Sequence, residues 1–265
     1  MEERTSRYSI IIPVYNESQN LNFLYQRIKK TMFPLSEDYE VIFIDDGSTD
    51  YSYEILREMS LDDIRIKVIS LSCNCGQHPA IIAGFKEARG AFLITLDADL
   101  QDIPEEIPRL INKIKEGYKM VAGQRINREE NIIRCIGSYI ANLIISILVG
   151  KRIRDYACML RIYSNDLAKK LISEYEKQPL FIPILIHKIT KDVAEINVRQ
   201  GNRLEGKSKY NYSKLAKGFF LTIIRYYPRL SDFLQKIGLG RRPSQLYIIK
   251  KRIEYGKESI LACIK

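Results

Sequence analysis

Two aspartates one residue apart end an apolar run in the stretch FLITLDADLQD, residues 92–102. The run is typical of a buried strand, and residues i and i+2 of a strand point to the same face. The carboxylates of Asp97 and Asp99 would therefore converge, with Gln101 close behind. Like charges held together are unfavourable unless a positive charge lies between or beside them. The stretch therefore predicts that a cation accompanies the two carboxylates.

Polar segments also follow three earlier apolar runs, and they read PVYNE, DDGSTD and NCGQH. In open α/β sheets, ligands bind beyond the carboxyl ends of the strands, so we expect these segments to join DADLQD at one edge. Neither G-x-G-x-x-G nor G-x-x-x-x-G-K-[ST] occurs, which argues against a dinucleotide fold and a Walker-type loop. The acidic edge instead suits a nucleotide held through a divalent cation, with other carboxylates reaching the base and ribose.

The elements that would hold these segments alternate between strand and helix. Short β-branched runs predict strands at 8–13, 39–45, 66–71 and 92–96, and helical apolar spacing lies between them. Near-continuous apolar strands separated by helices indicate a mostly parallel sheet that is covered on both faces. The sequence therefore predicts an α/β fold.

The second half of the chain continues the alternation less regularly. We expect a helix over EEIPRLINKIKEG, strands at KMVAGQ, ACMLRIY and EINVR, and a helix from Ser164. An amphipathic helix at 131–149 either packs on the sheet or lies on a membrane surface. A loop, GNRLEGKSKY, and a basic, aromatic tail follow.

Composition limits the class of protein. A chain of 265 residues with 46% hydrophobic and 28% charged residues suits one large domain, or a core domain with a tail. Five scattered cysteines favour reduced thiols in a cytosolic setting over a disulfide framework. The first residues lack the pattern of a signal peptide, and no window approaches the roughly 18 apolar residues of a membrane-spanning helix. We therefore expect a protein that is soluble or lies on a membrane surface.

The net charge of +10 is concentrated near the end of the sequence. From Arg203 to Lys265 there are 15 Lys and Arg against 4 Asp and Glu, whereas the remaining 202 residues hold 27 against 28. Either this segment is a solvated basic tail, or it faces an anionic partner. We expect a main domain over residues 1–215 and a basic amphipathic tail over 216–265 that contacts a membrane surface or a partner protein.

Six motifs in this order and spacing resemble the family-2 glycosyltransferases of the GT-A fold. They are IIPVYNE, VIFIDDGSTD, NCGQHPAIIAG, LDADLQD, DYACMLR and RLEGKSKY. The last two are similar to those of dolichyl-phosphate mannose synthase and the bacterial undecaprenyl-phosphate sugar transferases. The resemblance runs from about Tyr8 to about Leu215. It implies a Rossmann-like, mostly parallel sheet flanked by helices, and we expect the basic tail that follows to be helical.

The resemblance also implies roles for individual residues. Asp99 and Gln101 would approach a Mg²⁺ or Mn²⁺ ion on the donor diphosphate. The residues that would line the nucleotide pocket or complete the acidic motif are Pro13, Tyr15, Glu17, Asp46, Gly76, Gln77, Asp97 and Ala98. The residues that would contact donor or acceptor phosphates are Arg125, Arg134, Arg203, Ser208 and Lys209. A guanidinium suits bidentate phosphate contact, and Gly206 would allow a tight loop around an anion.

Asp155 and Arg161 match the family segment D-x-G-x-x-F-R, but Ala157 replaces the glycine and Leu160 the phenylalanine. The acceptor pocket can therefore differ in shape from that of relatives. A phosphate acceptor is mostly dianionic at neutral pH and hardly needs a general base. A sugar hydroxyl does need one, and Asp155 is then the candidate. His78 follows the Gly-Gln turn near the nucleotide, and His187 lies in an apolar segment.

Three functions follow from these features. The first is an inverting transferase that moves a sugar from a nucleotide sugar, UDP-linked, to a polyprenyl phosphate at the cytoplasmic face of a membrane. The second is the same donor chemistry with a saccharide hydroxyl as acceptor. The third, a non-catalytic basic module that binds nucleic acid or membrane, leaves the acidic strand ends unexplained. We therefore expect a metal-dependent enzyme without a nucleic-acid partner.

Overall fold

The computed structural model describes residues 7–35, 38–126, 142–143, 146–147, 154–177, 181–201, 249–254 and 257–260. Its strands are β1 (Tyr8–Val14), β2 (Tyr39–Asp45), β3 (Ile66–Leu71), β4 (Phe92–Thr95), β5 (Met120–Arg125), β6 (Arg161–Ser164), β7 (Val193–Val198), β8 (Ile249–Glu254) and β9 (Lys257–Ile260). The helices are α1 (Leu21–Met32), α2 (Ser52–Asp62), α3 (Gln77–Glu87), α4 (Ile107–Ile114), α6 (Asn165–Lys177) and α7 (Ile182–Ile189), with short 3-10 turns η1 (Phe33–Leu35) and η2 (Pro104–Glu106).

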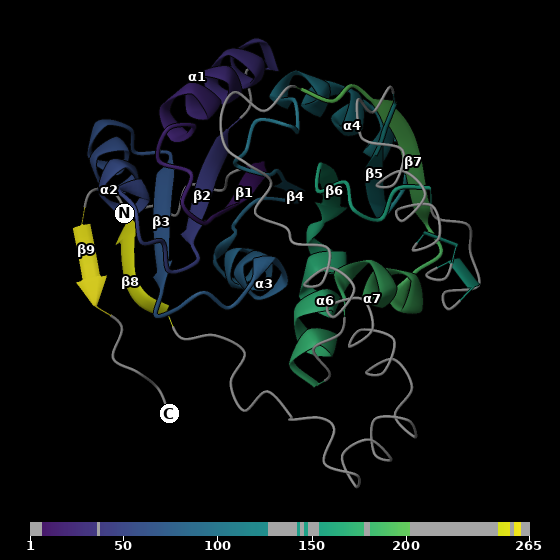
Figure 1. Cartoon of the computed structure of the whole chain (residues 1–265). Coiled ribbons are helices and arrows are strands. Elements are labelled where there is room, and N and C mark those ends of the chain that lie inside the picture. The colour runs from purple at the N-terminus through teal and green to yellow at the C-terminus, as the bar shows by residue number, and fades with distance from the viewer. Residues whose placement is uncertain are drawn as a thin grey trace, which may run out of the picture.

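The described strands form one sheet in the order β7-β5-β6-β4-β1-β2-β3-β8-β9 (Figure 1). Strands β4, β1, β2 and β3 are parallel neighbours, and β5 is parallel to β7. Strand β6 runs antiparallel between β4 and β5. The chain winds from β1 toward β2 and β3 and then crosses to β4 on the other side of β1. A ligand site is expected at this reversal of winding direction.

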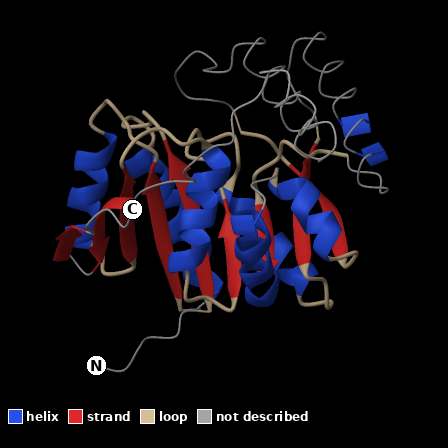
Figure 2. Ribbon diagram, turned by 90° about the horizontal axis from the view of Figure 1, so that it is seen from below, coloured by secondary structure: helices blue, strands red, loops and turns tan. Residues whose placement is uncertain are grey.

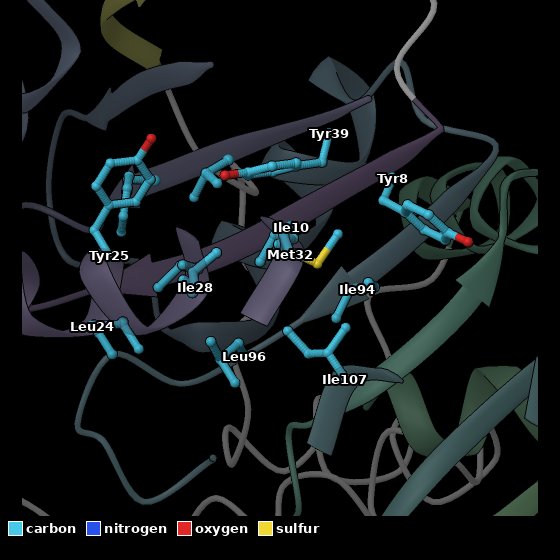
Figure 3. Packing of buried hydrophobic residues seen from close by; sticks show 14 of the residues in the cluster. Tyr8, Ile10, Leu24, Tyr25, Ile28, Met32, Tyr39, Ile94, Leu96 and Ile107 are labelled. Atoms are coloured by element: carbon cyan, nitrogen blue, oxygen red, sulfur yellow. The ribbon is translucent and has the colours of Figure 1, made fainter. Parts of the chain in front are cut away.

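Helices cover both faces of the sheet (Figure 2). Alternating strand residues enter opposite cores: Ile10 and Ile12 lie in one and Ile11 in the other. The first core packs α1 and α4 against the sheet, as the labelled side chains of Figure 3 show for Leu24, Ile28 and Ile107. The second core packs α3, α6 and α7 on the opposite face. The predicted mostly parallel sheet between helical layers is confirmed.

The described part of the expected tail is strand rather than helix. Strand β8 pairs antiparallel with β3, and β9 pairs with β8. Lys67 of β3 is 3% exposed, and its Nζ lies 3.6 Å from a carboxylate oxygen of Glu254 and 3.9 Å from one of Glu87. Arg252 of β8 contacts Glu87 at 2.5 Å. Residues 249–254 are thus part of the sheet, held by backbone pairing and by buried ion pairs.

Three of the predicted features fall largely outside the described residues. Of the predicted amphipathic helix at 131–149, the structure describes residues 142–143 and 146–147, which are helical. The loop GNRLEGKSKY beyond Gly201 and the tail up to residue 248 are not described. Within the parts of the chain that are described, no helix combines the length and the apolar character needed to cross a membrane.

Candidate active site

The polar segments that follow the strands meet at one edge of the sheet, as predicted. The ends of β1, β2, β3 and β4 lie together because these strands are parallel neighbours. Strand β6 is antiparallel to β4, so the residues before its start reach the same edge, where Thr95 Oγ1 donates a hydrogen bond to the carbonyl oxygen of Met159 at 2.5 Å. Strand β5 ends there with Arg125.

Side chains and backbone groups around the D-x-D turn position its carboxylates. Gln77 Nε2, at the start of α3, donates to Asp97 Oδ1 at 2.5 Å. The backbone N–H of Asp97 donates to Asp102 Oδ2 at 3.2 Å, and that of Gln101 donates to Asp99 Oδ1 at 3.1 Å. Leu100 between them has a φ of 67°, which is unusual for a bulky residue and marks local backbone strain.

The turn concentrates negative charge. Burial raises the pKa of Asp97 well above its usual value, and Asp102 and Asp99 raise it further, while Arg125 acts in the opposite direction. Burial also raises the pKa of Asp102 to about 7, against the lowering effect of Arg125. For both carboxyl groups, the effect of burial thus outweighs that of the nearby Arg125 cation. A divalent cation would supply further positive charge.

The donor atoms suit Mg²⁺ or Mn²⁺, because both ions prefer carboxylate and carbonyl oxygen ligands. Among the described residues, no group of three or more His, Cys, Asp or Glu side chains is placed to hold a metal ion. With Asp99 and Gln101 as the expected protein ligands, phosphate oxygens and water would have to complete the coordination of an ion. Such incomplete protein coordination is usual for Mg²⁺ on nucleotide phosphates.

The ends of β1, β2 and β3 are joined by hydrogen bonds on the other side of the D-x-D turn. Asp46 is buried, and its two carboxylate oxygens accept the backbone N–H groups of Cys75 at 2.7 Å and Gly76 at 2.9 Å. Burial raises the pKa of Asp46, whereas these two donors lower it. Glu17 accepts a hydrogen bond from Asn20 Nδ2 at 2.7 Å, and Tyr15 is 38% exposed. This half of the edge thus carries polar groups from the ends of β1, β2 and β3.

Gly47, directly after Asp46, has a φ of 69°, and a Cβ there would lie 2.6 Å from the backbone carbon of Cys73. Gly117 also has a positive φ, 104°, but a Cβ there would meet no atom within 4 Å. We expect Gly117→Ala to cost about 1–2 kcal/mol from left-handed backbone strain alone. Gly47→Ala should cost more, because the loop that holds Asp46 must also shift. Urea unfolding measures the two costs, and equal costs would contradict this role of Gly47.

Arg125 and Asp155 form a buried bidentate ion pair. Arg125 Nε donates to Asp155 Oδ2 at 2.9 Å and Nη2 to Oδ1 at 3.0 Å, and the backbone N–H of Arg125 also donates to Oδ2 at 3.2 Å. The two side chains are 12% and 1% exposed. Both carboxylate oxygens of Asp155 are thus bound to Arg125. This geometry favours a positioning role for the pair over proton abstraction by Asp155.

Arg161 is hydrogen-bonded to the backbone of the loop that carries Asp155. It is 2% exposed, and it donates hydrogen bonds to the carbonyl oxygens of Cys158, at 2.8 Å, and Tyr156. A buried guanidinium that binds two carbonyl groups of one turn fixes the path of the backbone there. Arg161, which the family segment includes, therefore orients the loop that carries Asp155.

The described residues of the predicted site all lie at this edge. They are Pro13, Tyr15, Glu17, Asp46, Gly76, Gln77, Asp97, Ala98, Asp99, Gln101, Arg125 and Asp155. The remaining predicted residues, Arg134, Arg203, Ser208 and Lys209, lie outside the described part of the chain.

Three residues of the site were missed by sequence reasoning. Asp102 is 5% exposed and accepts the Asp97 N–H, and its place in LDADLQD was the available signal. Asn16 joins the loop after β1 to the loop after β2, because its Oδ1 accepts the N–H of Thr49 at 2.7 Å. Gly201 donates its N–H to the Gln101 carbonyl oxygen at 2.9 Å, and a Cβ there would lie 2.5 Å from the Leu100 carbonyl oxygen. No pattern in the sequence around Gly201 predicts its contact with the D-x-D turn.

Comparison with known sequences gives one family and a consistent set of relatives. The model of glycosyl transferase family 2 matches residues 9–172. The chain is 41% identical over 214 residues to the undecaprenyl-phosphate 4-deoxy-4-formamido-L-arabinose transferase of Proteus mirabilis. This alignment covers 80% of the chain and 65% of the relative. The enzyme of the same name from Photorhabdus laumondii is 40% identical, with 80% and 66% covered. The chain thus spans slightly less than two thirds of the length of these relatives.

Solved structures share the fold at low sequence identity. Glucosyl-3-phosphoglycerate synthase from Mycobacterium tuberculosis, in complex with Mn²⁺, UDP and glucosyl-3-phosphoglycerate, aligns with a TM-score of 0.57 at 15% identity, covering 89% of this chain and 81% of that one. Its complex with Mn²⁺ and UDP-glucose aligns with the same TM-score and identity. The likeness confirms the expected GT-A fold.

Proposed function

The chain belongs to glycosyl transferase family 2, and from this premise we propose that it is an inverting transferase that moves a sugar from a UDP-sugar to a polyprenyl phosphate. The observation that carries the proposal is the acidic edge, where Asp97, Asp99 and Asp102 lie at the same edge of the sheet as the hydrogen-bonded ends of β1, β2 and β3. The names of the relatives support the acceptor, since they act on undecaprenyl phosphate. The solved neighbours that hold UDP and Mn²⁺ support the donor.

In this function, the two halves of the edge bind different parts of the donor. Asp46, Pro13, Tyr15 and Glu17 receive the base and ribose. Asp99 and Gln101 would hold a divalent ion, which would supply positive charge beside the departing diphosphate. Gln77 keeps Asp97 in place through the 2.5 Å hydrogen bond. Preorganised groups of this kind lower the barrier because they need no rearrangement as the sugar–phosphate bond breaks.

The Arg125–Asp155 pair favours a phosphate acceptor over a hydroxyl acceptor. A dianionic phosphate oxygen attacks the sugar without a general base, whereas a hydroxyl must lose a proton. The described candidate for that base, Asp155, has both oxygens bound to Arg125. We propose that Arg134, Arg203, Ser208 and Lys209 add donors to the donor and acceptor phosphates. The hydroxyl acceptor stays the second candidate function.

The proposal is tested directly by incubating the purified protein with a panel of UDP-sugars and Mn²⁺. Release of UDP is measured with undecaprenyl phosphate, with an oligosaccharide acceptor, and with neither. We expect UDP-4-deoxy-4-formamido-L-arabinose to be among the donors, and release to depend on the lipid phosphate. Release that depends on the oligosaccharide instead would favour the second function. No release with any donor and acceptor would contradict both.

We further propose that the protein works as a peripheral protein at the cytoplasmic face of a membrane, held by the basic segment after Arg203. Cationic residues near an anionic leaflet contribute about 1 kcal/mol each, and aromatic rings settle at the level of the headgroups. Phe219, Phe220, Tyr226 and Tyr227 supply such rings in sequence. A membrane protein partner would use the same segment.

Binding to vesicles distinguishes these partners. We expect the protein to sediment with anionic vesicles at low salt and not to sediment with neutral vesicles. It should dissociate near 1 M salt, because the electrostatic screening length is then about 3 Å. Truncation is a poor variant because it removes β8 from the sheet. Instead Lys214, Lys217, Arg225 and Arg229 are changed to Gln, which should abolish sedimentation. The matched control changes the exposed Lys30, Lys115, Lys169 and Lys170 to Gln. Wild-type protein that stays in the supernatant with anionic vesicles would favour a protein partner.

A further inference from the structure

Three aromatic rings gather at the active edge, on the face of the sheet that α3, α6 and α7 cover. The centroids of His78 and Phe181 are 4.5 Å apart with an interplanar angle of 84°. Those of Tyr156 and Phe181 are 5.4 Å apart at 66°. All three residues are partly exposed. They come from the first turn of α3, the loop before β6 and the residue that precedes α7, and we call them the ring cluster.

The ring cluster is tied to the donor site through its neighbours in the chain. Gln77, which precedes His78, is bonded to Asp97 of the D-x-D turn. Tyr156 follows Asp155, and its backbone is held at both ends. Its N–H donates to Asn142 Oδ1 at 3.2 Å, and its carbonyl oxygen accepts a hydrogen bond from Arg161. The rings therefore lie in defined positions near the D-x-D turn.

His78 retains hydrogen-bonding capacity in this cluster. Burial, with the Arg161 cation nearby, lowers the pKa of His78 to about 3, so the imidazole is neutral. Its Nδ1 is buried and has no hydrogen-bond partner among the described residues. Buried polar atoms in proteins are normally paired, so this Nδ1 is a place where a water molecule or a ligand group can supply the missing hydrogen bond.

We propose that the ring cluster of His78, Tyr156 and Phe181 is the subsite for the transferred sugar of the nucleotide-sugar donor, and that this sugar is uncharged. The inference rests on the proposed function. With the nucleoside at Asp46 and the diphosphate at Asp99, the sugar extends from the far end of the diphosphate, away from the ends of β2 and β3. The ring cluster lies beside Asp97 on that side.

The chemistry of the cluster fits a sugar. A pyranose presents apolar C–H groups on its ring faces and hydroxyl groups at its rim. Binding sites of this type combine aromatic walls with a few polar groups that set orientation. Phe181 and Tyr156 supply the wall, and His78 supplies a polar group. A charged sugar substituent would be costly against these rings, because burial of an unpaired charge is strongly unfavourable.

Two other uses of the rings remain as outcomes of the test. They could receive the first units of the polyprenyl chain, or they could only pack the two loops together. The hydrogen bond between Gln77 and Asp97 places the cluster next to the D-x-D turn, and this proximity favours the donor sugar.

The test compares UDP with UDP-sugars on full-length protein in the presence of Mn²⁺. Dissociation constants are measured by calorimetry for UDP, UDP-4-deoxy-4-formamido-L-arabinose and UDP-glucuronate. The variants are Tyr156→Leu and Phe181→Leu. The control is Phe85→Leu, which removes a buried ring that meets Tyr163 at 5.2 Å within the same core. Saturation transfer from protein aromatic protons to the ligand gives a second readout, with the uracil protons as internal reference.

We expect each ring variant to bind the uncharged UDP-sugar about tenfold more weakly and UDP within about twofold of wild type. The ratio of sugar to uracil saturation should fall in both ring variants and stay constant in Phe85→Leu. UDP-glucuronate should bind wild type more weakly than the uncharged sugar does. An unchanged preference for the UDP-sugar in both ring variants would overturn the subsite while leaving the proposed function intact.

The remaining outcomes are equally decisive. Ring variants that keep donor affinity but raise the KM for undecaprenyl phosphate would assign the rings to the acceptor and overturn the proposal. Wild-type protein that binds no UDP-sugar with Mn²⁺ would contradict the proposed function itself, and the sugar subsite with it.

Discussion

Replacing Asp99 by Asn should leave the protein folded and remove the effect of a divalent ion on nucleotide binding. The amide keeps the size of the side chain and can still accept the N–H of Gln101, which is 3.1 Å from Oδ1 in the wild type. It loses the negative charge that attracts Mg²⁺ or Mn²⁺. Since charge stabilisation at the departing group is worth about a hundredfold or more in rate, turnover should fall by at least that factor.

Calorimetric titration of UDP with and without Mn²⁺ measures the binding effect. Wild type should bind UDP more tightly with Mn²⁺, and Asp99→Asn should bind it equally in both conditions. Asp62→Asn, at an exposed site on α2, is the control for loss of one carboxylate and should behave as wild type. Equal Mn²⁺ dependence in wild type and Asp99→Asn would show that the ion is held elsewhere.

Replacing Asp155 by Ala should destabilise the protein by about 3–5 kcal/mol, because it leaves the buried Arg125 guanidinium without its carboxylate. The pair is almost fully shielded from solvent, and each oxygen of Asp155 accepts a hydrogen bond from the guanidinium. By contrast, Glu174→Ala breaks the exposed pair of Glu174 and Lys177 on α6 and should cost about 0.5 kcal/mol or less. Urea unfolding of both variants measures the difference.

A double-mutant cycle separates this role from that of a general base. If the pair acts as a unit, the loss in Arg125→Met with Asp155→Ala should be smaller than the sum of the single losses. Turnover should fall in each single variant because the loop before β6 loses its anchor. Unchanged stability of Asp155→Ala, together with a large loss of turnover and of the acid limb of the pH–rate profile, would contradict the positioning role. It would favour a hydroxyl acceptor.

The first hundred residues were predictable because their signals are local. Apolar runs such as those of β1 and β2 and the helical spacing of α1 depend on neighbours within a few residues. Once the sheet is parallel, the carboxyl ends of its strands must meet, so the positions of Asp46, Gln77 and Asp97 follow from topology. The carboxylates of Asp97 and Asp99 interact as expected, but β4 ends at Thr95, so a turn and not the period of a strand brings them together.

Helix α7 and strand β8 could not be predicted in the same way, because their sequences carry no clear local signal. The segment of α7 is apolar on nearly all sides, so its pattern does not separate helix from buried strand. Strand β8, with the sequence IKKRIE, has a charged composition, and only its pairing with β3, far back in the chain, makes it a strand. Lys67 of β3 also forms ion pairs with Glu254 and Glu87. These residues are too far apart in the sequence for a short segment to predict the contacts.

The sequence by itself determined the acidic edge and the family whose motifs it shares, and it predicted a divalent ion at that edge. Only the tertiary structure decided that Asp155 is bound to Arg125 and that Phe181 brings His78 and Tyr156 together. The physical reason is that these contacts join residues whose separation along the chain carries no periodic signal. Such side chains meet because α7 packs against α6 and β6 runs antiparallel beside β4, and this packing depends on the whole chain.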